Sequence, residues 1–144
     1  MELRSKLRHL EQLRSHVILL IGSNDLKRNV PEQSLRESYL ALVKFLLRRV
    51  KRIILVATPV IPRCAKDPHH FLKLQFLNDL VYSFQSDPRV AVVDLNTYKD
   101  GKVMLPHFFE PTFHDGRIDQ LHLNAKAFCC LLEKLKTFCA ILSV

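Results

Sequence analysis

The segment Val17-Ile-Leu-Leu-Ile-Gly-Ser-Asn-Asp25 decides the fold. Its first five residues are apolar without alternation, which is typical of a strand buried on both faces, and the polar residues after Gly22 end it. Two further runs of this kind occur at residues 53–57 and 90–94. Because strands of this composition occur in parallel sheets covered by helices on both sides, we expect an α/β fold.

Amphipathic stretches separate these runs. The spacing of leucines predicts a first helix that ends near Arg14, and the apolar stripes predict further helices over 32–49, 68–85 and 124–142. In the third of these helices we expect the following residues to face inward: Phe71, Leu74, Leu77, Leu80, Val81 and Phe84. Residues 95–121 are predicted to be irregular. The order α-β-α-β-α-β-loop-α favours right-handed crossovers in one domain that spans residues 1–144.

Composition places the chain among ordinary globular proteins, since 48% of its 144 residues are hydrophobic and 25% are charged. No apolar run is long enough to span a membrane, and the charged first residues do not form a secretory signal. We therefore expect an intracellular, cytoplasmic protein without a membrane partner. Four cysteines, Cys64, Cys129, Cys130 and Cys139, lack paired CxxC spacing and are expected to be buried free thiols. Cys64, His69 and His70 lack a fourth ligand, so no metal site is predicted.

A formal net charge of +8 attracts polyanions. The charge is dense at Arg48, Arg49, Lys51 and Arg52, where the second predicted helix meets the second strand. These residues form either a solvated helix face or a surface that binds RNA weakly and without sequence preference. No RNP, zinc-finger or helix-turn-helix motif accompanies them.

Polar residues that could carry chemistry follow the strands, at the edge where such sheets hold their sites. Asn24 comes after the first strand, Thr58 and Pro59 come after the second, and Asp119 and His122 precede the last helix. The Asn24 amide could donate to an oxyanion, and Asp119 could orient His122. Each group also has a plainer interpretation, as a turn, a helix cap or a satisfied histidine.

The two motifs together resemble the SGNH (GDSL-type) hydrolase superfamily. The G-x-N-D stretch at Gly22–Asp25 is similar to the third conserved block of the family, and Asp119-Gln-Leu-His-Leu-Asn124 is similar to the fifth. The resemblance implies a three-layer α/β/α, flavodoxin-like fold and serine ester hydrolysis without a cofactor. It also implies that Asn24 and Gly22 contribute to the oxyanion hole, that His122 is the general base and that Asp119 orients it.

The sequence departs from the family pattern at the nucleophile. No Gly-Asp-Ser block occurs, Ser23 occupies a variable position of the third block, and Ala127 stands where family members often have glycine. The catalytic serine is therefore unknown. We expect a fold truncated at its N-terminal side, without two strands and the catalytic elbow, that is inactive by itself. It would act on a small ester only if that segment were restored.

A second function stays open, because superfamily members need not be enzymes. The SGNH-like domain of the insect protein Oskar lacks the catalytic residues and binds RNA, and SGNH-like domains also occur in retroelement proteins. A basic chain fits a non-catalytic, RNA-binding or interaction module of this kind. With its neighbouring strand absent, the apolar strand 17–21 would lie at the sheet edge, where we expect self-association.

Overall fold

The computed structural model describes residues 16–22, 25, 28, 30–62, 67–95, 97–98, 102–103, 109–112, 114–117 and 122–142. Three parallel strands form the sheet, in the spatial order β1 (His16–Leu19), β2 (Arg52–Ala57) and β3 (Val90–Asp94). The pairing places Leu55 between Leu19 and Val92, so that the three strands end at a common edge. The predicted parallel α/β fold is confirmed.

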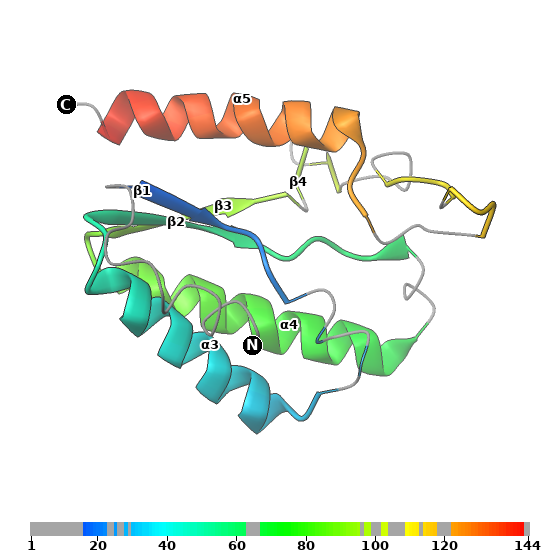
Figure 1. Cartoon of the computed structure of the whole chain (residues 1–144), viewed down its shortest axis with the longest axis horizontal. Helices are drawn as coiled ribbons and strands as arrows, with labels where there is room; N and C mark the ends of the chain where they lie inside the picture. Colours follow the sequence, from blue (N-terminus) through cyan, green and yellow to red (C-terminus); the bar gives the residue numbers. More distant parts are fainter. Residues whose placement is uncertain are drawn as a thin grey trace.

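In the described part of the chain, three long helices cover the sheet. Helices α3 (Glu32–Leu47) and α4 (Pro68–Ser83) connect successive strands and lie together on one face, whereas α5 (Ala125–Leu142) lies on the other (Figure 1). The molecule is therefore a three-layer α/β/α sandwich. A turn of 3₁₀ helix, η2 (Phe84–Ser86), leads from α4 towards β3, so that α4 ends two residues earlier than predicted. Helix α3 also ends two residues earlier than predicted, whereas α5 ends at the predicted residue 142.

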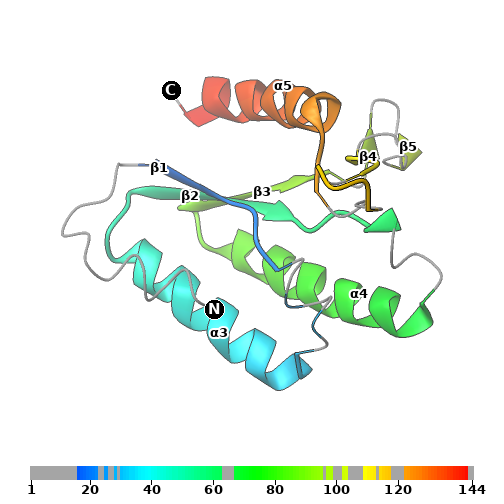
Figure 2. The ribbon, with the colours of Figure 1, turned by 45° about the vertical axis from the view of Figure 1, so that its right-hand side comes forward.

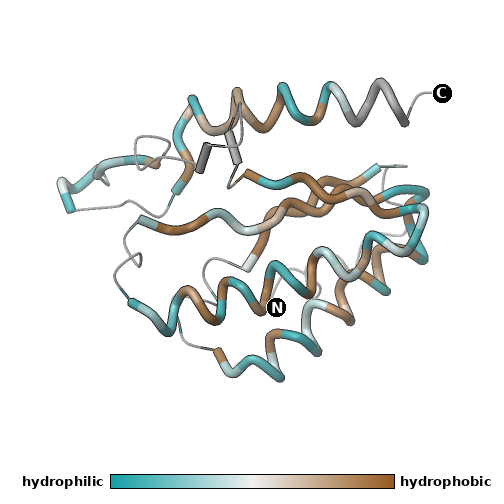
Figure 3. Tube along the Cα trace, turned by 180° about the vertical axis from the view of Figure 1, so that it is seen from behind, coloured by the Kyte–Doolittle hydropathy of each residue, from teal (hydrophilic) through white to brown (hydrophobic). Residues whose placement is uncertain are grey.

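Alternation along the strands divides the core between the two faces. Ile53 and Leu55 of β2 pack with α3 and α4, while Ile54 and Val56 pack with α5. Each face thus has its own apolar cluster, and the strands lie between them as the most hydrophobic part of the chain (Figure 3). Because it is flanked by strands and helices on every side, β2 is almost completely buried.

The prediction that the first strand is buried on both faces is wrong. Leu19 is buried, Val17 is half-buried, and Ile18 exposes 51% of its surface. Ile18 and Leu20 point to the α5 face, but α5 packs against β2 and β3, so that it leaves the outer part of β1 uncovered. Strand β1 also ends at Leu19, two residues before the apolar run ends.

The stretch 95–121, predicted to be irregular, contains ordered pairing. Strands β4 (Thr97–Tyr98) and β5 (Lys102–Val103) form an antiparallel pair (Figure 2). Phe109 makes an isolated bridge with Leu123. Two-residue strands carry too short a pattern to be recognised from alternation. Phe109 is buried in the α5 cluster, which ties the end of this stretch to the core.

Candidate functional site

Gly22 makes the turn that leads out of β1. Its φ angle is +113°, a conformation that side chains with a Cβ rarely adopt. A Cβ at this position would lie 2.5 Å from Leu77 Cδ2, so that the backbone rests directly on α4. Glycine is therefore required at this position both for the turn and for the close packing.

Thr58 and Asn78 hold the ends of β1 and β2 together. The Thr58 N–H donates to Asn78 Oδ1 at 2.8 Å, and Asn78 Nδ2 donates to the Thr58 carbonyl at 2.9 Å. The Thr58 hydroxyl donates to the Ile21 carbonyl at 3.2 Å, next to Gly22. The side chain of an α4 residue thus satisfies backbone groups of a fully buried residue at the sheet edge.

His122 lies three residues before α5, which begins beyond the carboxyl ends of the strands (Figures 1 and 2). The Glu110 N–H donates to the His122 carbonyl at 2.8 Å, beside the bridge between Phe109 and Leu123. These contacts fix the backbone of His122, while its side chain is exposed. A histidine held in this way has an imidazole that a substrate could reach.

Asn124 caps α5. Its Oδ1 accepts from the Ala127 N–H at 3.2 Å, and its Nδ2 donates to the Phe109 carbonyl at 3.4 Å. Asn124 thereby joins the helix start to the stretch that positions His122. Ala127 is completely buried against the sheet, so that this small residue lets α5 approach closely.

Several predicted site residues lie outside the described part of the chain. They include the proposed oxyanion donor and the proposed orienting carboxylate, together with other residues that the sequence singled out: Asn24, Asp119, Ser23, Cys64 and His107. Gly22 and His122 are the members of the predicted site that the structure describes: Gly22 follows β1, and His122 lies three residues before α5.

The sequence pattern does not predict the burial of His70. This residue is 4% exposed and continues the buried stripe of α4 formed by Leu74 and Leu77. Among the described residues its Nε2 has no hydrogen-bond partner. Burial lowers the pKa of its imidazole, an effect that Asp67 partly opposes. Phe71, predicted to face inward, is instead 42% exposed.

The described residues contain no group of three side chains that could hold a metal ion. The cysteine prediction is only partly correct, since Cys130 is buried and Cys129 is exposed, both as free thiols. Nor does the described part of the chain include a helix with the length and apolarity to cross a membrane.

The basic residues gather at the other end of the sheet, where the strands begin. Arg48, Arg49 and Lys51 are exposed and Arg52 is half-buried; these four residues are called the basic rim below. Arg49 stacks on Phe45, with 3.8 Å between its Cζ and the ring centroid, and donates to the Phe45 carbonyl. A guanidinium held against a ring presents its charge in a fixed place.

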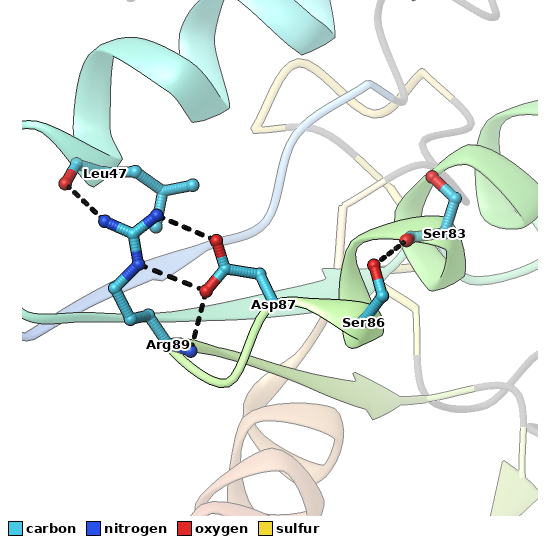
Figure 4. A network of polar contacts seen from close by, with 5 residues as sticks. All are labelled: Leu47, Ser83, Ser86, Asp87 and Arg89. Atoms are coloured by element: carbon cyan, nitrogen blue, oxygen red, sulfur yellow. Dashed lines mark hydrogen bonds and ion pairs between the residues drawn. The ribbon is translucent and has the colours of Figure 1, made fainter.

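An ion pair lies close to this rim. Arg89 makes a bidentate contact with Asp87, with distances of 3.1 and 2.8 Å, and it also donates to the Leu47 carbonyl (Figure 4). The hydrogen bonds from Arg89 lower the pKa of Asp87 to about 2. Asp87 is therefore engaged by Arg89, and the neighbouring rim keeps its positive charge.

The model of the GDSL-like Lipase/Acylhydrolase family matches residues 2–127 of this chain. The chain belongs to this family. The match includes the turn at Gly22 and the segment from Asp119 to His122, and the GDSL family membership expected from these motifs is thus confirmed. No curated protein matches the chain.

Proposed function

We propose that this GDSL-family chain supplies the base and oxyanion half of a serine ester hydrolase site, and that it needs a serine from outside its 144 residues. The proposal is supported by two positions: Gly22 follows β1, and His122 lies three residues before α5, which begins beyond the carboxyl ends of the strands (Figure 1). In open α/β sheets, this edge is where substrates bind.

In the proposed reaction, His122 accepts the proton of the serine hydroxyl as the serine oxygen attacks the ester carbonyl carbon. Asn24 donates to the oxyanion that forms, and Asp119 holds the imidazole in its orientation. The proton passes from His122 to the departing alcohol, and water then hydrolyses the acyl-serine by the same route. The close packing of Gly22 against α4, two residues before Asn24, supports the assignment of Asn24 as the donor.

The chain by itself is expected to be inactive, because the sequence contains no Gly-Asp-Ser block. A fluorophosphonate probe, followed by intact-mass measurement, should leave the chain unmodified, and a short-chain aryl ester should not be hydrolysed above background. A stoichiometric adduct on any serine of the chain would contradict the proposal.

A chimaera tests the positive half of the proposal. Residues 16–144 are fused behind the serine-bearing strands of an active GDSL hydrolase, and fusions with a cooperative thermal transition are assayed for ester hydrolysis. We expect activity that His122→Ala reduces by about 10³-fold or more, since a general base in such a site contributes on this scale. His114→Ala is the matched control, because His114 is also exposed in the same region. Equal activity of the two variants would contradict the role of His122.

The basic rim supports a second candidate function, a non-catalytic module that binds RNA weakly. Its cations lie at the amino ends of the strands, so that binding there would leave the carboxyl edge unoccupied. Phosphate contacts release counterions, and the affinity for a single-stranded RNA should therefore fall steeply between low and physiological salt. Affinity that is independent of salt, or that depends on RNA sequence, would contradict binding by charge alone.

A further inference from the structure

The outer side of β1 carries apolar surface that the described residues do not cover. Ile18 is 51% exposed on the α5 face of the sheet, and Phe128 and Leu132 of α5 are 49% and 56% exposed. Phe128 and Leu132 are one helical turn apart and therefore form one stripe. These three residues are called the β1 patch below.

The orientation of α5 places this stripe towards β1. Lys134 donates from α5 to the carbonyl of Asp94 in β3, which fixes the side of the helix that faces the β3 edge. Phe128 and Leu132 lie roughly 120–160° around the helix axis from Lys134, at 3.6 residues per turn. Since β1 and β3 are the outer strands of the sheet that the described residues form, the stripe flanks the same side as Ile18.

Strand β1 also has an edge suited to pairing. Within the described part of the chain it pairs with β2 alone, and the run from Val17 to Ile21 contains no charged residue or proline. Protein sheets normally protect an edge strand with such residues, because an apolar edge accepts another strand.

We propose that this chain forms a two-fold symmetric dimer in which the β1 strands of two copies pair antiparallel. In the register that we assign, Ile18 lies opposite Ile18 of the second copy, and Val17 lies opposite Leu19. Directly opposed residues of an antiparallel pair point to the same face. The two Ile18 side chains therefore meet on the α5 face, between the two stripes of Phe128 and Leu132.

The distribution of charge favours this arrangement over parallel pairing. The basic rim lies at the amino edge of the sheet, whereas the described acidic residues at and beyond the carboxyl edge include Asp25, Glu32, Asp67 and Glu110. Antiparallel pairing places the rim of one copy at the same end as the carboxyl edge of the other. Parallel pairing would place both rims together, where like charges repel. The proposal does not rest on the ester chemistry, and it applies to the 144-residue chain alone, because the serine-bearing strand of the proposed hydrolase would occupy the same β1 edge.

Light scattering after size-exclusion chromatography, across a concentration series at physiological salt, tests the proposal. The average mass should rise from 16.8 kDa to twice that value and then stop, because a two-fold interface closes on itself. Ile18→Lys should keep the chain monomeric, with an unchanged circular dichroism spectrum. Leu72→Lys is the control and should dimerise as the unchanged chain does, since Leu72 is 62% exposed on α4.

A charge-pairing experiment tests the register. Ile18→Lys and Ile18→Glu should each be monomeric alone, and an equal mixture should form a heterodimer, because the two introduced charges would face each other. A general loss of stability would not be repaired by mixing. A monomeric unchanged chain, a dimer that tolerates Ile18→Lys, a mass that grows beyond two copies, or a mixture that stays monomeric would each overturn the proposal.

Discussion

The two faces of the sheet are covered to different extents. On one face, α3 and α4 pack against all three strands and bury side chains of each strand, such as Leu19, Leu55 and Val92. On the other face, α5 covers β2 and β3 but leaves Ile18 exposed. The comparison teaches that hydrophobic composition and burial are separate properties, because the same apolar run in β1 is buried on one side and exposed on the other.

The largest expected effect is a loss of stability, and it should distinguish the α3 side of the sheet from the exposed side of α5. Leu42→Ala removes a completely buried side chain of α3 and should lower the free energy of unfolding by about 2–5 kcal/mol. Leu132→Ala, on the exposed side of α5, should change it by less than about 0.5 kcal/mol at a protein concentration at which the chain is monomeric. Urea denaturation measures both. Equal losses of free energy would show that Leu132 is as well packed as Leu42.

The turn after β1 should be the next most sensitive position. Gly22→Ala introduces a Cβ in a left-handed conformation and against Leu77, and we expect it to cost about 1–3 kcal/mol of stability. Gly116→Ala is the matched control, since Gly116 also has a positive φ, of +83°, but the described residues place no atom within 4 Å of the added Cβ. A Gly22 variant as stable as the Gly116 variant would contradict the close contact between the turn and α4.

Asn78→Ala should lower the free energy of unfolding by about 1–3 kcal/mol, because it removes both hydrogen bonds to the backbone of buried Thr58. Hydrogen exchange at the Ile21 and Gly22 amides should also accelerate in this variant, because Asn78 holds Thr58, which donates to the Ile21 carbonyl. Gln75→Ala on the exposed side of the same helix is the control. If both the stability and the hydrogen exchange are unchanged, the contacts between Asn78 and Thr58 do not hold this edge of the sheet together.

The smallest expected effect is a pH dependence from His70. Burial holds its pKa below the ordinary value of about 6.5, so the folded state binds protons less readily than the unfolded state. The stabilisation is complete above the ordinary pKa and is lost as the pH falls towards the lowered pKa. His70→Leu should therefore reduce the loss of stability between neutral and mildly acidic pH, whereas His69→Leu at an exposed position should not. An identical pH dependence in both variants would contradict this origin.

The sequence predicts the strands well because their apolar runs are wholly buried in β2 and nearly so in β3. It fails where burial depends on a neighbour, as in β1, whose pattern cannot show whether a helix covers its second face. At the start of α4 it predicts that Phe71 is buried, whereas His70 is buried instead. Hydropathy favours burial of the phenylalanine, but the position on the helix turns the histidine towards the core. The positions of Gly22 and His122 follow from motif and topology, whereas the role of Asn78 requires the contact with Thr58 to be seen.

The central claim is that the third and fifth family motifs form one site at the carboxyl edge, and a crystal structure of this chain tests it most directly. The account predicts that the side chains of Asn24 and His122 face one another at that edge, with the Asp119 carboxylate beside the imidazole. Asn24 and His122 on opposite edges of the sheet would contradict it.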